Sequence, residues 1–220
     1  MISRVRWDEH VQREVQRYRD GEARLAGAAD ADARQRQLSR MGNAAFGAGL
    51  ALLMQGDPEA SEWFARAAER YRESFRDASP DSWGRLIAMI KSRVLAGDWD
   101  AAAHEAEFAL EQRAAEAESP IGHYAACLAL LVLGRDEEAR PLADALRTED
   151  GFPHDVGDSL ATIAADDRVG YVEAIESVLE SFETRDVHLE DVPVADTVLV
   201  LQALASRREL AAELASPLLP

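Results

Sequence analysis

Three short segments with the same character interrupt the apolar helical stretches of this chain. Each begins with a glycine, continues with acidic residues and ends with an alanine. A glycine in the left-handed conformation can end one helix, and a following aspartate can cap the next one. The segments therefore predict a series of helical hairpins, and they are Gly56-Asp57-Pro58-Glu59-Ala60, Gly97-Asp98-Trp99-Asp100-Ala101 and Gly134-Arg135-Asp136-Glu137-Glu138-Ala139.

The stretches between these turns have apolar residues at helical spacing. Ser79-Pro80 and Ser119-Pro120 recur forty residues apart as openings of the second and third hairpins. Such a period is typical of helical repeats. We expect an all-α protein with one domain, an irregular helical-hairpin solenoid of the tetratricopeptide-like kind. Residues 1–40 would be an amphipathic helix and linker packed on the array, and residues 41–220 the repeat domain.

Two segments are less regular than the rest. After Gly134 the turns lose their pattern, and the fourth becomes Asp166-Asp167-Arg168. The last element contains the β-branched run Thr197-Val198-Leu199-Val200, but strong helix formers flank this run. We therefore predict one helix from Ala195 to Leu214. The helix expected over residues 41–55 contains glycines among its apolar residues, and these predict a close crossing with the helix that follows it.

The charge is strongly negative, with 41 acidic against 24 basic residues, a formal net charge of -17. Such a surface should repel nucleic acid and anionic membranes. Lys91 is the only lysine, and the acidic, arginine-rich composition resembles that of proteins from salt-loving archaea. We expect the protein to lose stability when salt is removed, because concentrated salt screens repulsion between its carboxylates. Alternatively, one acidic face mimics a nucleic-acid backbone and binds a basic partner.

The sequence contains few patterns that indicate catalysis or metal binding. Cys127 is the single cysteine, lies in an apolar run and is expected in the core. No apolar stretch is long enough for a signal peptide or a membrane span, so we expect a cytoplasmic protein. The five histidines are dispersed, and none forms a His-Glu-x-x-His pair. We therefore expect no enzyme, no catalytic residues, no cofactor and no metal.

Trp99 is the candidate for contact with a partner. It follows the turn Gly97-Asp98, near the tip of a hairpin, with Asp100 beside it. A tryptophan there either packs on the neighbouring repeat or anchors a partner protein, since tryptophan is enriched among interface hot spots. We name Trp99, Asp98 and Asp100 as candidate partner-binding residues.

The C-terminal third resembles the end of the immunity protein 49 family. The residues that carry the resemblance are 193–205 and Ala212 to Pro220, which end in Ser216-Pro217-Leu218-Leu219-Pro220, and residues 81–98 are similar as well. The resemblance covers about the last 140 residues and implies an all-helical repeat protein that is an antidote to a polymorphic toxin. It supplies no set of functional residues.

Three functions remain open from the sequence. The first is an immunity protein that binds and neutralises a cognate toxin, for which a basic domain such as a nuclease would suit the acidic surface. The second is a general tetratricopeptide-like scaffold or regulatory adaptor. The third, which we disfavour, is a cryptic all-helical enzyme that uses His104, Glu107 and His123. The sequence leaves the partner, the binding face and the oligomeric state open.

Overall fold

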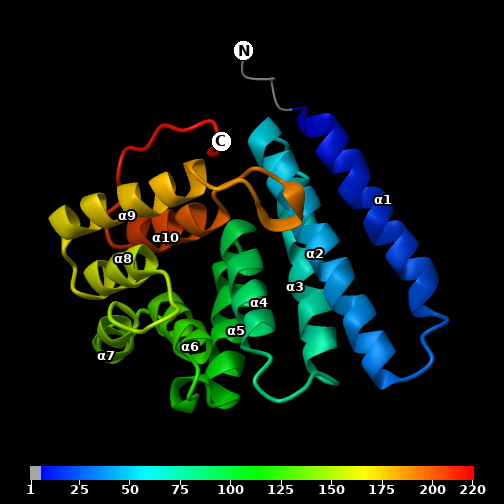
Figure 1. Ribbon diagram of the computed structural model, residues 1–220, viewed down its shortest axis with the longest axis horizontal. Coiled ribbons are helices and arrows are strands. Elements are labelled where there is room, and N and C mark those ends of the chain that lie inside the picture. Colours follow the sequence, from blue (N-terminus) through cyan, green and yellow to red (C-terminus); the bar gives the residue numbers. More distant parts are fainter. Residues whose placement is uncertain (1–5) are drawn as a thin grey trace.

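The computed structural model describes residues 6–220, and in this range the protein is all-helical, with no strand (Figure 1). The all-α prediction is confirmed. None of the helices in the described range is long and apolar enough to cross a membrane. The helices are α1 (Trp7–Leu25), α2 (Ala31–Gln55), α3 (Ala60–Phe75), α4 (Trp83–Leu95), α5 (Trp99–Glu111), α6 (Pro120–Val132), α7 (Asp136–Leu146), α8 (His154–Ala164), α9 (Arg168–Glu183) and α10 (Asp196–Ser206), with short 3-10 helices η1 (Ala114–Glu116) and η2 (Leu189–Asp191).

The glycine turns have the predicted backbone geometry, but their aspartates differ in role. Gly56, Gly97 and Gly134 have φ of 69°, 73° and 71°, which is the left-handed region that favours glycine. Asp98 caps α5 by accepting a hydrogen bond from the Ala101 amide. Asp136 does not cap α7, because it is already the first residue of that helix. Asp57 does not cap α3 either, because the residue before that helix is Glu59 and no side chain caps it. The predicted aspartate cap is therefore wrong for the first and third turns.

Two predicted helix starts also need correction. α2 begins at Ala31, so residues 31–40, which the sequence assigned to a linker, form its first turns, and Asp30 caps them through the Ala33 amide. Ser119 does cap a helix that starts with proline, α6. Ser79-Pro80 does not: α4 begins only at Trp83. Between Pro80 and Trp83, Asp81 has a positive φ, which a helix does not allow.

Helices that are consecutive in the chain pack against each other from α1 to α9, and one continuous hydrophobic core runs through them. The predicted close crossing of α2 and α3 is confirmed. A Cβ atom added to Gly42 or Gly49 would lie 2.8 Å from ring atoms of Tyr71 or Phe64 respectively. Glycine is required at both positions because the rings lie against the α2 backbone.

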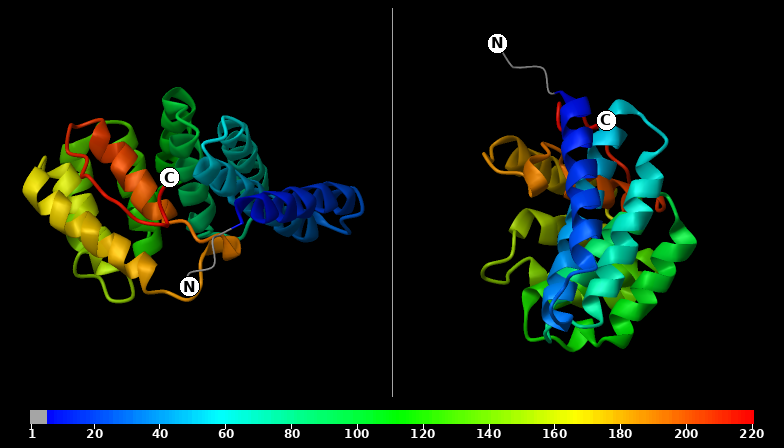
Figure 2. Two further views of the ribbon diagram at one scale, coloured as in Figure 1. Left: turned by 90° about the horizontal axis from the view of Figure 1, so that it is seen from above. Right: turned by 90° about the vertical axis from the view of Figure 1, so that its right-hand side faces the viewer.

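The last helix folds back on the molecule. α10 contacts α4, α8 and α9 (Figure 2), so it joins helices that are far apart in the sequence. The run 197–200 is helical, as predicted. The helix ends at Ser206, however, and not at Leu214. Glu209, three residues after the helix end, has a left-handed φ of 61°, which a continuing helix does not allow. The Gln202 side chain then holds the following segment, because its Nε2 donates to the Ala212 C=O (2.6 Å) and its Oε1 accepts from the Ala212 N–H (3.1 Å).

Candidate functional site

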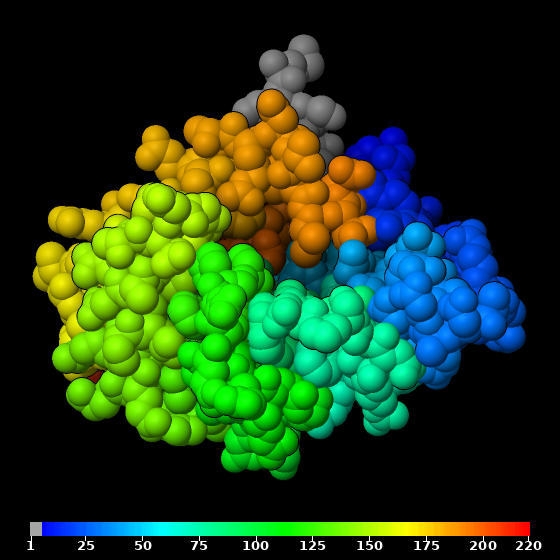
Figure 3. All heavy atoms as spheres, turned by 60° about the horizontal axis from the view of Figure 1, so that its bottom comes forward, coloured from blue at the N-terminus to red at the C-terminus, as the bar shows by residue number. Residues whose placement is uncertain are grey.

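A cleft of about 450 Å³ opens between α2, α4 and the η2 segment. Figure 3 shows this hollow between the orange η2 segment and the blue and teal segments of α2 and α4, with α10 in its depth. Its volume lies in the range of about 300–1,000 Å³ that is typical of ligand sites. We call it the α2–α4 cleft. It is lined by Ser39, Asn43, Phe46, Tyr71, Ser82, Gly84, Arg85, Ile87, Ala88, Lys91, Leu189 and Asp196.

Helical spacing brings these residues to one place. Residues three or four apart share a helix face, and Ser39, Asn43 and Phe46 follow this spacing on α2. On α4, Arg85, Ala88 and Lys91 lie three residues apart. The cleft therefore has two walls made by single helix faces, and α10 and η2 complete it.

Lys91 occupies one end of the cleft and is bound there. Its ammonium donates a hydrogen bond to the Asp196 carboxylate and another, of 3.1 Å, to Thr197 Oγ1. The side chains of Lys91 and Asp196 are only 11% and 7% exposed. The only lysine of the chain thus makes a nearly buried ion pair that connects α4 to the first turn of α10.

A chain of hydrogen bonds holds η2 beside the cleft. The Tyr71 hydroxyl donates to Asn43 Oδ1 at 2.8 Å, and Asn43 Nδ2 donates to Glu190 Oε1 at 2.8 Å. The other Glu190 oxygen lies 2.5 Å from the Arg17 guanidinium. Burial raises the pKa of Tyr71, so its hydroxyl keeps its proton and remains a donor. η2 is therefore tied to α1, α2 and α3 by polar contacts.

Arg85 lies toward the other end of α4 and is not neutralised. Its Nη2 donates to the side-chain oxygen of Gln35, but Nη1 is buried and has no hydrogen-bond partner among residues 6–220. Within residues 6–220 Arg85 takes part in no ion pair, whereas the other arginines without one are exposed. Burial lowers the pKa of Arg85, which reports that its charge is poorly solvated.

The rim of the cleft on the η2 side is apolar and exposed. Val187 is 74% exposed and Leu189, which also lines the cleft, is 47% exposed. Glu190 and Asp191 both have positive φ. This backbone is unfavourable for residues other than glycine. Two large apolar side chains are thus exposed just before a strained turn, and one of them lines the cleft.

The sequence candidates Trp99, Asp98 and Asp100 lie at the α4–α5 turn, and none of them lines the cleft. Trp99 is partly buried, and the guanidinium carbon of Arg207 lies 4.3 Å from the centre of its ring. The Asp98 carboxylate is occupied as the α5 cap, and the Asp100 carbonyl oxygen lies 2.8 Å from His104 Nδ1. Their role in partner binding stays a prediction.

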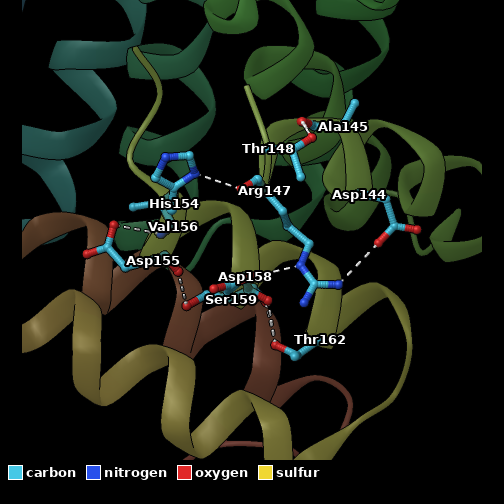
Figure 4. A network of polar contacts seen from close by, with 10 residues as sticks. All are labelled: Asp144, Ala145, Arg147, Thr148, His154, Asp155, Val156, Asp158, Ser159 and Thr162. Atoms are coloured by element: carbon cyan, nitrogen blue, oxygen red, sulfur yellow. Dashed lines mark hydrogen bonds and ion pairs between the residues drawn. The ribbon is translucent and has the colours of Figure 1, made fainter. Parts of the chain in front are cut away.

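His154 and Cys127 lie in structural surroundings. In residues 6–220 no group of three or more His, Cys, Asp or Glu side chains is arranged to hold a metal ion. Figure 4 shows how His154 is used: its Nδ1 lies 2.6 Å from the Arg147 carbonyl oxygen, while Arg147 Nε donates to Asp158 at 2.7 Å. These contacts join the end of α7 to α8. Cys127 is buried, and burial raises its pKa to about 12, so the thiolate is scarce at neutral pH.

Comparisons with protein-family models, curated proteins and solved structures found no match to this chain. Sequence reasoning missed the α2–α4 cleft, although one signal was available. A single lysine inside the apolar stretch from Leu86 to Leu95 needs a partner if that stretch is buried.

Proposed function

We propose that this protein is a non-enzymatic binding protein, an irregular helical-hairpin solenoid of the tetratricopeptide-like kind that neutralises a cognate toxin as an immunity protein. The packing of consecutive helices and the resemblance of the C-terminal third support this proposal. The observation that carries it is the exposed apolar rim, Val187 and Leu189, beside an open cleft. Exposed apolar side chains next to a hollow are typical of interaction sites.

The acidic surface fits a basic partner. With a net charge of -17, the protein would attract a basic toxin domain and speed its association. In a salt-rich cytoplasm, for which the composition is suited, screening weakens this long-range attraction. Affinity would then depend on apolar contacts at the rim and on short-range pairs inside the cleft.

The test is protection in a co-expression assay. The candidate toxin is encoded beside this chain or recovered with it by pull-down in molar salt, and it is expressed with and without the protein. We expect the wild-type protein to restore growth and to bind the toxin directly. Growth arrest in spite of a folded, expressed protein would contradict the proposal.

A matched pair of variants locates the interface. Val187 and Val169 are exposed to almost the same extent, 74% and 73%, but only Val187 lies two residues from Leu189, which lines the cleft. We expect Val187→Glu to weaken toxin binding at least about tenfold, because it places a charge in an apolar contact. Val169→Glu on α9 should leave binding unchanged. Equal effects of the two substitutions would exclude the rim as the interface.

A further inference from the structure

We propose that the α2–α4 cleft binds one carboxylate side chain of the partner protein, paired with Arg85, next to an apolar residue that covers the Val187–Leu189 rim. This inference rests on the proposed function, because it names the chemistry by which the binding protein recognises its partner. It goes beyond that function because it assigns the cleft a specific ligand group and a specific residue that binds it.

The charges that face the cleft support an anionic group. Lys91 and Asp196 neutralise each other, and among the residues that the structure describes they are the only other charged ones in the lining. Glu190 on η2 is directed to Asn43 and Arg17. The lining therefore has one uncompensated charge, the Arg85 guanidinium, although the whole chain is strongly acidic. A buried charge without a partner is costly, and a ligand carboxylate would supply the acceptor that Nη1 lacks.

The same charges favour a carboxylate over a phosphate. A phosphate group would bring close to two negative charges, whereas the cleft offers one free cation and already contains the Asp196 carboxylate. One carboxylate balances one guanidinium. A neutral hydroxyl donor, Ser39, lies in the same lining and can bind the outer carboxylate oxygen.

The rim favours a protein segment over a small free anion. Val187 and Leu189 extend the apolar surface beyond the cleft to the outside, and Ile87 and Ala88 continue it inside. A small carboxylate in the cleft would leave Val187 uncovered. A partner that places an acidic side chain beside an apolar one would cover both parts at once.

The experiment uses two capped dipeptides that differ only in charge, N-acetyl-leucyl-glutamate amide and N-acetyl-leucyl-glutamine amide. Binding to the full-length protein is followed by NMR, through the Nε–H signal of Arg85 and the methyl signals of Ile87 and Leu189. We expect the glutamate peptide to shift these signals with a dissociation constant of about 1 mM, and the glutamine peptide to bind at least tenfold more weakly, as a charged hydrogen bond predicts. Equal binding of the two peptides, or no binding, would overturn the proposal. Sodium acetate is the third probe, and an equal response to it would also overturn it, because the rim would then contribute nothing.

Variants assign the effect to Arg85. Arg85→Gln should abolish the difference between the two peptides, and Arg85→Lys should keep part of it because the charge remains. Arg76→Gln is the control, since Arg76 is exposed and has no ion pair in the described part of the chain. A loss of binding in Arg76→Gln equal to that in Arg85→Gln would contradict the assignment.

The two proposals fail in different ways. If the wild-type protein and Arg85→Gln protect equally against the toxin, the carboxylate site is wrong and the immunity function stands. If no toxin is neutralised but the glutamate peptide binds through Arg85, the immunity function is wrong and the carboxylate site stands.

Discussion

The two cationic side chains of α4 that line the α2–α4 cleft differ in how they are paired. Lys91 and Arg85 lie six residues apart on α4, and both line the cleft. Lys91 is paired with Asp196 and connects α4 to α10. Arg85 has a neutral partner at Nη2 and none at Nη1. Lys91 thus stabilises the fold, whereas Arg85 remains available to a ligand. The two roles predict different effects of substitution on stability.

The largest effect is expected at the Lys91 end. Lys91→Met leaves the Asp196 carboxylate nearly buried without its cation, which should lower the free energy of unfolding by about 3–5 kcal/mol. Urea denaturation in high salt measures this loss. The double variant Lys91→Met/Asp196→Leu should recover most of it, because no buried charge remains. A double variant as unstable as the single one would show that packing, not charge, dominates at this end.

A much smaller effect is expected at the Arg85 end. Arg85→Met keeps most of the side-chain stem but removes the poorly solvated charge. We expect the free energy of unfolding to change by less than about 1 kcal/mol, because relief of the unsatisfied Nη1 donor is offset by loss of the bond from Nη2 to the buried Gln35 side chain. The same urea experiment measures it. A loss of stability above about 1 kcal/mol would mean that Arg85 supports the fold as Lys91 does.

The helices could be predicted from the sequence, but the contacts between segments that are distant in the chain could not. The glycine turns and the apolar spacing predicted the helices, because those signals act over a few residues. The α10 end at Ser206 precedes Glu209 in the left-handed conformation, which is unusual for a glutamate and is not signalled by the sequence. The Lys91–Asp196 pair depends on a contact between residues that are far apart in the chain. The cleft could not be predicted for the same reason, since its lining comes from α2, α3, α4, α10 and the η2 segment.

A third buried charge, on α1, gives a test by pH. The Glu14 side chain is fully enclosed and accepts hydrogen bonds from Arg13 (2.6 Å) and Arg17 (2.7 Å). Burial raises its pKa above the ordinary value of 4.5, although the two arginines oppose this shift. The folded protein therefore holds the Glu14 proton more tightly than the unfolded chain does.

The sign of the pH effect follows. The stabilisation from protonated Glu14 is complete below pH 4.5 and is lost as the pH rises through the higher folded pKa. Glu14→Gln resembles the protonated form at every pH. We expect the stability of the wild-type protein relative to Glu14→Gln to fall as the pH rises from about 4.5 to 7. Thermal unfolding of both proteins across this range measures it. A rise in this relative stability with pH would show that the fold favours the ionised form of Glu14, as it favours the charged form of Lys91.

The smallest effect is expected where a cation lies at the surface. Arg207 covers Trp99 at 4.3 Å from guanidinium carbon to ring centre, and Arg207 is exposed. Arg207→Ala should cost about 0.5 kcal/mol of unfolding free energy, the range of exposed cation–π contacts, as measured by urea denaturation. It also tests Trp99 as a partner anchor. If a partner replaces Arg207 on the ring, Arg207→Ala should preserve or strengthen toxin binding, whereas Trp99→Ala should weaken it. If Trp99 only stabilises the fold, neither substitution should change binding beyond its effect on stability.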